Sequence, residues 1–223
     1  MESSIIELSQ DGSHTVYSTK YSAHYHSIYG AIEEAIHVFI SAGLYYKYRQ
    51  ANKDLRIFEM GLGTGLNAYI TLLESKKLNT KVEYISVETD PISLDQANQL
   101  NYSDQFINGN QELFQQIHKT AWDTPHKITD HFTLEKHQTP IQDFTFEESL
   151  DIIYFDAFAP SCQPELWEED IHRKLYNSLN PSGILVTYCA KGQFKRMLRS
   201  LGYRLEMVNG PNKKREMTRA VKV

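Results

Sequence analysis

One stretch of sequence decides the fold: Arg56-Ile57-Phe58-Glu59-Met60-Gly61-Leu62-Gly63-Thr64-Gly65-Leu66-Asn67. An apolar strand pattern over residues 55–60 runs directly into a loop with three glycines, and a helical pattern follows over residues 65–75. Glycine lets a backbone turn sharply and approach a ligand closely, and a helix N-terminus offers free N–H donors. The stretch therefore predicts a nucleotide-like cofactor held by Gly61, Gly63, Thr64, Gly65 and Asn67.

Two glutamates indicate which cofactor the loop binds. The glycines alone also fit a dinucleotide pattern, Gly63-x-Gly65-x-x-Ala68, so they do not separate NAD from S-adenosylmethionine. Glu59, at the strand end, is suited to the cationic amino group of a methionine moiety and would repel a pyrophosphate. Glu88 ends the next strand, where a carboxylate accepts hydrogen bonds from both ribose hydroxyls, although it could simply begin a helix. S-adenosylmethionine is therefore the predicted cofactor.

The rest of the chain has the alternating pattern of an α/β protein. Strand patterns over residues 82–88, 132–136, 151–156 and 183–188 are separated mostly by helical segments, which predicts a parallel sheet with helices on both faces. One of these helical segments covers residues 165–179, and Asn180-Pro181-Ser182-Gly183 predicts a helix stop and turn before the next strand. Residues 203–208 and 217–223 read as two further strands. The turn signal Asn209-Gly210-Pro211-Asn212 between them predicts a hairpin.

We therefore expect an α/β fold of the Rossmann-like class I S-adenosylmethionine-dependent methyltransferase type. Its mostly parallel seven-stranded sheet should end in a C-terminal antiparallel hairpin. Residues 1–50 should form an N-terminal helical extension, because apolar side chains recur at helical spacing over residues 28–49. This extension should pack on a methyltransferase domain of residues 51–223, giving one structural unit.

The fourth predicted strand ends in Asp156-Ala157-Phe158-Ala159-Pro160. Ligands of open α/β sheets bind outside the carboxyl ends of the strands, so Asp156 should face the methyl donor. An alkylammonium has no lone pair and titrates near 10, judging by lysine, so a methyltransferase acting on an amine must hold the neutral form. Asp156 is therefore the predicted catalytic group that orients the amine and takes its proton, with capping of the next turn as the alternative. Phe158 is predicted to stack on a base.

Composition restricts the setting more than the function. The 223 residues suffice for one domain, and the two cysteines, Cys162 and Cys189, exclude a disulfide framework. With no secretory signal pattern and no apolar run long enough to span a membrane, the expected location is cytoplasmic. The net charge of −5 is uneven: residues 186–223 carry +8 and the remainder −13. The basic segment is either a solvated face or a phosphate-binding surface.

Three sets of residues together resemble the MnmC-type methyltransferases, in the standalone form sometimes called MnmD. They are the glycine loop, Asp156-Ala157-Phe158-Ala159-Pro160 with Pro164-Glu165-Leu166-Trp167, and Lys214-Arg215-Glu216-Met217. Tyr17-Ser18, Tyr25-His26-Ser27 and His37-Val38-Phe39-Ile40 are similar to the opening of the same family, so the resemblance spans nearly the whole chain. It implies conversion of 5-aminomethyl-2-thiouridine to 5-methylaminomethyl-2-thiouridine at the tRNA wobble position.

The resemblance also implies partners. Some members carry an FAD-dependent oxidase that prepares the substrate; 223 residues leave no room for an FAD domain, so separate enzymes should supply the aminomethyl group. The family usually has an acidic residue near the adenine after the third strand. This sequence instead reads Lys136-His137-Gln138-Thr139-Pro140, with Asp143 three positions later, so no adenine-binding residue is predicted.

The remaining candidates concern the substrate. A tRNA anticodon arm should contact the basic segment, and Tyr25 and His26 should line the cofactor or substrate pocket unless they only pack the N-terminal arm. No metal site is predicted. Alternatives are an N-methyltransferase of a small-molecule amine, a non-catalytic nucleotide- or RNA-binding module, and an NAD oxidoreductase. The predicted RNA contacts are Lys191, which could instead cap a helix, and Arg196, Lys213, Lys214 and Arg215.

Overall fold

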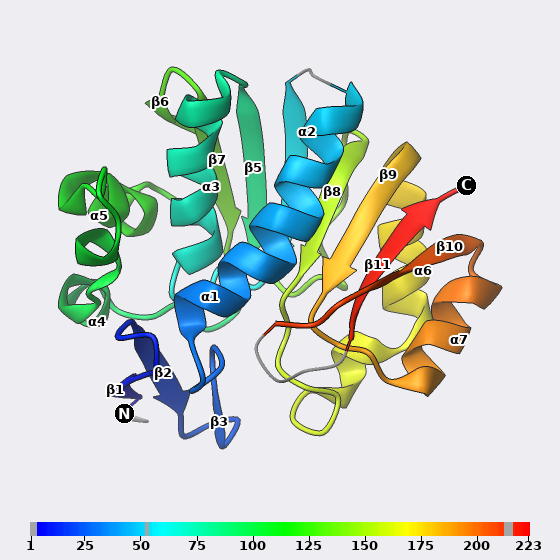
Figure 1. Cartoon of the computed structure of the whole chain (residues 1–223), viewed down its shortest axis with the longest axis horizontal. Helices are drawn as coiled ribbons and strands as arrows, with labels where there is room; N and C mark the ends of the chain where they lie inside the picture. Colours follow the sequence, from blue (N-terminus) through cyan, green and yellow to red (C-terminus); the bar gives the residue numbers. More distant parts are fainter. Residues whose placement is uncertain (1–3, 52–53, 212–215) are drawn as a thin grey trace.

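The computed structural model describes residues 4–51, 54–211 and 216–223. Its centre is a twisted sheet that runs through the whole molecule (Figure 1). Eight strands of the described chain form this sheet, in the spatial order β10 (Tyr203–Val208), β11 (Met217–Lys222), β9 (Leu179–Thr187), β8 (Leu150–Phe155), β4 (Leu55–Met60), β5 (Val82–Val87), β7 (Phe132–His137) and β6 (His126–Thr129).

The strand directions confirm the predicted fold class. β9, β8, β4, β5 and β7 are parallel to one another, whereas β10 and β11 form an antiparallel hairpin whose second strand pairs antiparallel with β9. The sheet has one strand more than the seven expected. The extra strand, β6, has four residues and pairs antiparallel with β7 across a register shift, so it is too short to show an alternating pattern in the sequence.

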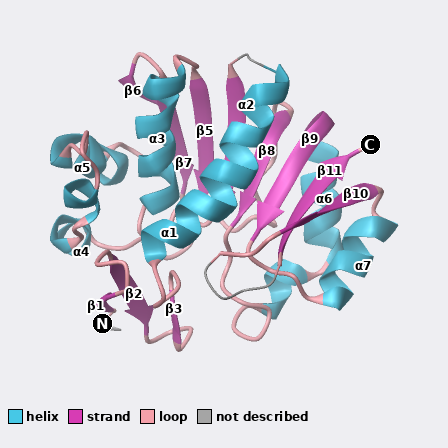
Figure 2. Cartoon of the chain, in the orientation of Figure 1, coloured by secondary structure: helices cyan, strands magenta, loops and turns pink. Residues whose placement is uncertain are grey.

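Helices cover both faces of the sheet, as the alternation predicts (Figure 2). Successive residues of β8 belong to different cores: Ile152 and Tyr154 pack in one cluster, Ile153 and Phe155 in the other. Strand side chains alternate between the two faces, so a sheet buried on both sides has nearly continuous apolar strands. The helical elements after β4 are α3 (Leu66–Leu78), α4 (Leu94–Gln99), η2 (Tyr102–Gln105), α5 (Gln111–Lys119), η3 (Pro164–Trp167), α6 (Glu169–Ser178) and α7 (Gly192–Ser200).

The N-terminal part contains the expected long helix and, before it, a small sheet that was not predicted. The helix is continuous through α1 (Ala31–Ala35), the π-helical segment η1 (Ile36–Tyr45) and α2 (Tyr46–Ala51), and η1 packs on β8, β9 and β11. The antiparallel strands β1 (Ile5–Leu8), β2 (His14–Ser18) and β3 (Ala23–His24) lie beyond the carboxyl ends of the parallel strands (Figure 1). The extension is therefore not helical throughout; its strands have two to five residues, too few for a reliable pattern.

Two boundaries also differ from expectation. The helix predicted over residues 165–179 is divided, because Glu168 takes an extended conformation between η3 and α6. The turn predicted at Asn180-Pro181-Ser182-Gly183 lies inside β9, where Ser182 has a φ of 62° and the register with β8 shifts. The turn residues thus produce a local irregularity and not the end of the strand. No helix in the described residues is long and apolar enough to cross a membrane.

Candidate active site

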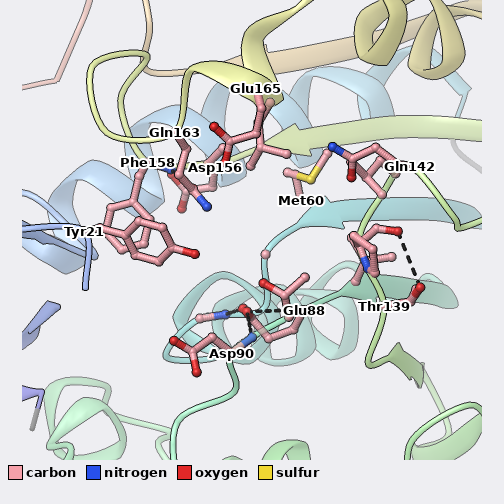
Figure 3. Close-up of a pocket in the computed structure, with 18 of the residues that line it drawn as sticks. Tyr21, Met60, Glu88, Asp90, Thr139, Gln142, Asp156, Phe158, Gln163 and Glu165 are labelled. Atoms are coloured by element: carbon pink, nitrogen blue, oxygen red, sulfur yellow. Dashed lines mark hydrogen bonds between the residues drawn. The ribbon is translucent and has the colours of Figure 1, made fainter. Parts of the chain in front are cut away.

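A cavity opens at the carboxyl ends of β4, β5 and β8, where the sequence places the cofactor. Figure 3 shows Asp156 and Glu165 on one side of it and Glu88 and Asp90 on the opposite side. Gly61 and Gly63 of the glycine loop form part of the wall. The predicted strand ends therefore meet around one cavity.

The glycine loop takes a conformation that favours glycine. Gly63 has a φ of 52°, and a Cβ atom there would lie 3.0 Å from Cδ1 of Tyr25. Gly65, which begins α3, has a φ of 74°, and a Cβ atom would lie 2.9 Å from Nε2 of His118. Left-handed backbone is costly for residues with a Cβ atom. Both the backbone angle and the close neighbours thus require glycine.

Glu88 links this loop to the end of β5. Its Oε2 accepts a hydrogen bond from the backbone N–H of Gly63 at 2.9 Å (Figure 3). Its Oε1 accepts from the backbone N–H groups of Thr89 and Asp90, both at 2.8 Å. The predicted ribose-binding carboxylate therefore lines the cavity and also fixes the conformation of two loops.

Asp156 lies at the cavity and is connected to the residues beneath it. The side-chain nitrogen of Asn67 donates to Oδ2 of Asp156 at 2.8 Å and to Oε1 of Glu59 at 2.9 Å. Glu59 is 1% exposed, and neither Glu59 nor Asn67 is among the described residues that line the cavity. Their expected contact with the cofactor stays a prediction.

The cavity is acidic. Within the described part of the chain, its wall includes no Lys, Arg or His, but it contains the four carboxylates Glu88, Asp90, Asp156 and Glu165. A site of this charge favours cationic ligands and disfavours the pyrophosphate of a dinucleotide. The negative charge of the cavity thus agrees with the sequence-based prediction of S-adenosylmethionine in preference to NAD.

Aromatic rings form another part of the wall. The ring of Phe158 lies 4.7 Å from that of Tyr21 and 5.0 Å from that of Tyr25, centroid to centroid. The backbone N–H of Phe158 donates a hydrogen bond to the side chain of Gln163 at 3.3 Å, and the indole of Trp167 donates to the backbone carbonyl of Phe158 at 2.8 Å. The loop that carries Phe158 is therefore held in position, and a planar ligand would meet a formed aromatic surface.

Thr64 and His26 lie behind the glycine loop and do not line the cavity. The Thr64 hydroxyl accepts a hydrogen bond from Tyr102 at 3.2 Å and lies 3.4 Å from Nε2 of His26. Burial lowers the pKa of His26 to about 4. The pKa of His118, whose Nε2 donates to the Thr64 carbonyl at 3.2 Å, is also lowered to about 4, by burial and then by Lys136. Both rings are therefore neutral supports of the loop at neutral pH.

The predicted RNA-binding residues lie outside the cavity. Lys191, the residue just before α7, and Arg196, on the helix itself, are both exposed. α7 lies next to the loop between β8 and α6 (Figure 1), and Phe194 packs against Trp167 with ring centroids 5.0 Å apart. The remaining three predicted contacts lie outside the described residues: Lys213, Lys214 and Arg215.

Some cavity residues were missed by the sequence analysis. The segment 139–142, which carries no carboxylate, lines the wall near Met60, whereas Asp143 does not line it. Gln142 faces the cavity there (Figure 3), and its side-chain amide can both donate and accept hydrogen bonds. A residue whose only signal is its distance from a strand end is hard to detect in one sequence. The others missed are Tyr21, Asp90, Gln163 and Glu165, of which Glu165 stood in a recognised motif.

Known proteins resemble this chain over most of its length. The bifunctional tRNA 5-methylaminomethyl-2-thiouridine biosynthesis protein MnmC of Idiomarina loihiensis is 27% identical over 215 residues, which cover 90% of this chain and 36% of that protein. The protein of the same name from Pseudoalteromonas atlantica is 29% identical, and the match covers 95% of this chain and 32% of that protein. The chain therefore spans about a third of the length of these relatives.

A solved structure and a family model identify the fold and the family. The crystal structure of MNMC2 from Aquifex aeolicus matches with a TM-score of 0.80 at 21% identity, and the match covers 99% of this chain and 70% of that one. At this identity the likeness demonstrates a shared fold. The family model described as S-adenosyl-L-methionine-dependent methyltransferase matches residues 110–223, more than half of the chain. The chain therefore belongs to this family of methyltransferases, and S-adenosylmethionine is its cofactor.

Proposed function

We propose that this protein methylates the primary amine of 5-aminomethyl-2-thiouridine at the wobble position of tRNA. The observation that carries the proposal is the position of Asp156, at the end of β8, in an acidic cavity with an aromatic wall. The names of the MnmC relatives point to the same modification. The tRNA substrate is part of this proposal.

The residues of the cavity fit S-adenosylmethionine. When bound, this cofactor supplies an electrophilic methyl group on a sulfonium. The four carboxylates of the wall, of which Asp90 pairs with Lys20 at 3.4 Å, suit a sulfonium and an ammonium. Glu88 has an orientation, fixed by three backbone N–H groups, in which it can accept the ribose hydroxyls. We assign the adenine edge to Gln142 and the glycine loop to the methionine end.

Asp156 performs the proton chemistry in this proposal. An amine that enters as an ammonium must lose a proton before its nitrogen has a lone pair. The Asp156 carboxylate accepts a hydrogen bond from the amine and takes that proton, while Asn67 keeps it in place through its 2.8 Å hydrogen bond. Positioning of the amine supplies much of the remaining rate enhancement.

Recognition of the nucleotide divides between the cavity and the surface. Tyr21, Tyr25 and Phe158 offer faces on which a uracil ring stacks. The acidic cavity repels phosphate groups, so the backbone of the anticodon arm must bind elsewhere. The contacts we assign are two exposed cations, Lys191 just before α7 and Arg196 on it. Lys213, Lys214 and Arg215, which lie outside the described residues, are further candidates.

As part of this proposal, separate enzymes supply the aminomethyl substrate. The reaction class required is one that leaves a primary amine on the C5 methylene of the uridine. We place both steps in the cytoplasm, where tRNA is available.

The test is incubation with methyl-labelled S-adenosylmethionine and tRNA that carries or lacks the aminomethyl group, followed by digestion to nucleosides. We expect label only in 5-methylaminomethyl-2-thiouridine from the aminomethyl tRNA. Absence of label from that tRNA would overturn the proposal. Methylation of a free amine together with no salt-sensitive tRNA binding would instead indicate a small-molecule methyltransferase.

A further inference from the structure

Two carboxyl groups near the cofactor share a single amide. Asn67, at the start of α3, uses both hydrogens of its side-chain nitrogen: one goes to Glu59 on β4 and the other to Asp156 after β8. The two donor–acceptor distances, 2.9 and 2.8 Å, are those of well-formed hydrogen bonds. The amide therefore fixes the relative position of the two carboxyl groups.

The two carboxyl groups differ in their surroundings. Glu59 is 1% exposed and lies beneath the cavity, whereas Asp156 is half-buried and belongs to the cavity wall. Oε2 of Glu59 is fully buried and has no hydrogen-bond partner among the described residues. An ionised carboxylate in such a place would be stabilised by the Asn67 amide and by the neighbouring Tyr84 hydroxyl, which together do not compensate for its loss of hydration.

Repulsion from the Asp156 carboxylate also disfavours the ionised form of Glu59. Two carboxylates bridged by one amide nitrogen lie roughly 5 Å apart, a distance at which two negative charges in a partly buried site repel each other. The pair therefore holds one negative charge most favourably. The better-hydrated member, Asp156, keeps it.

We propose that Glu59 is a neutral carboxylic acid that acts as a positioning residue: through Asn67 it orients Asp156 and leaves that group as the charged proton acceptor. Glu59 then does not hold the cationic amino group of S-adenosylmethionine, the role that its place in the sequence suggested. This inference rests on the proposed function, since it assigns the proton acceptor of that reaction.

The titration behaviour of the buried group agrees with this arrangement. Burial raises the pKa of Glu59 well above its ordinary value, and the negative charges of Asp156 and Glu88 raise it further, while Asn67 and the Tyr84 hydroxyl oppose the shift. A raised pKa favours the protonated form of this carboxyl group. Glutamine has nearly the same shape as a protonated glutamic acid, so E59Q should preserve the site.

The first experiment measures S-adenosylmethionine binding by calorimetry, without tRNA. We expect E59Q to change Kd by less than about threefold, as does the control E112Q, which removes an exposed glutamate on α5. A loss of about tenfold or more in E59Q alone would overturn the inference, because it would identify Glu59 as the direct ionic partner of the cofactor.

The second experiment observes the carboxyl group itself. Carbon NMR of the cofactor-free protein with carboxyl-labelled glutamate should contain one signal that is absent from E59Q. We expect this signal to keep the chemical shift of a protonated acid between about pH 6 and 8. A carboxylate shift at neutral pH would overturn the inference. Both binding and NMR remain informative if tRNA is not the substrate, so this failure is distinct from that of the proposed function.

The third experiment separates positioning from a general structural role. N67A removes a hydrogen bond from the charged form of Asp156, so the acid limb of kcat/KM should move to higher pH by about one unit. E59Q should leave the acid limb of the kcat/KM profile unchanged. E59A, if folded, should lower kcat by about tenfold or more, with a smaller change in the KM for the cofactor. A slower N67A enzyme with an unmoved limb would contradict the positioning role.

Discussion

Asp156 and Gly63 show how much of the site depends on single residues. D156N keeps the shape of the side chain and its capacity to accept from Asn67, but it cannot take a proton. We expect turnover to fall by about 100-fold or more while the S-adenosylmethionine Kd changes by no more than a few-fold. Single-turnover methylation and calorimetry measure the two quantities. D143N is the matched control outside the cavity; full activity of D156N would remove Asp156 from the mechanism.

The conformation of Gly63 gives a second prediction at this scale. In G63A the methyl group would combine a φ of 52° with a contact of 3.0 Å to the Tyr25 ring, so the loop must shift. Strain of about 1–2 kcal/mol should weaken S-adenosylmethionine binding by about tenfold or more. G192A, at the start of α7, has no positive φ and meets only the flexible end of Arg196, so it should bind normally. Unchanged Kd in G63A would show that the loop adapts without cost.

The site was predictable from sequence where a residue ends a strand. Asp156 and Glu88 could be placed at the cavity because the carboxyl ends of parallel strands meet at one edge. Tyr21 and Gln142 could not, since each reaches the cavity from a loop whose path no periodic pattern records. The depth of Glu59 below the cavity also depends on how α3 packs on β4, which motif spacing does not specify.

At the scale of elements, α7 is the part of the surface that we expect to bind RNA. Arg196 and Arg199 are exposed on this helix, whereas Lys195 forms an ion pair with Glu216 at 2.5 Å. R196Q/R199Q should weaken tRNA binding by roughly three- to tenfold and lower the slope of log K against log salt by about 2.

Fluorescence anisotropy over a range of potassium chloride concentrations measures both effects. The control K76Q removes an exposed lysine near the end of α3, a helix that lies on the other side of the molecule from α7 (Figure 1). An unchanged salt slope in the α7 variant would exclude this helix from the RNA interface. Equal losses in both variants would indicate binding governed by overall charge.

Elements with strong periodicity were predicted correctly, and short or interrupted elements were not. The long N-terminal helix and β4, β5 and β8 follow apolar patterns that burial explains. β6 and the small sheet β1–β3 are stabilised by pairing with neighbours, which is a tertiary effect. The break at Glu168 likewise has no glycine or proline signal of its own.

For the whole molecule, one buried cation links stability to pH. Lys136 is 1% exposed; its ammonium donates to the His118 carbonyl at 3.0 Å and lies 4.6 Å from the Trp122 ring centre. Burial lowers its pKa to about 8 from 10.5. Between about pH 8 and 10.5, Lys136 is protonated in the unfolded chain and largely neutral in the folded protein. The free energy of unfolding therefore rises with pH in this range, by up to about 1.4 kcal/mol per pH unit.

Denaturant unfolding of wild type and K136M at several pH values tests this coupling. The unfolding free energy of the wild type minus that of K136M should rise between about pH 8 and 10.5 and stay constant below that window. K119M, which removes an exposed lysine on α5, should follow the wild type at every pH. A constant difference between wild type and K136M across the window would show that Lys136 titrates normally.

The position of β11 has a consequence for biosynthesis. In the sheet, β11 lies between β10 and β9, although it follows both strands in the chain. β10 is therefore joined to the sheet only through β11. While the ribosome still holds residues 217–222, β9 has an open edge and β10 has no partner, so the nascent chain exposes strands that can pair with other chains. Closure of the sheet is therefore a late event, and stalled or prematurely terminated chains should be unusually prone to aggregation and degradation.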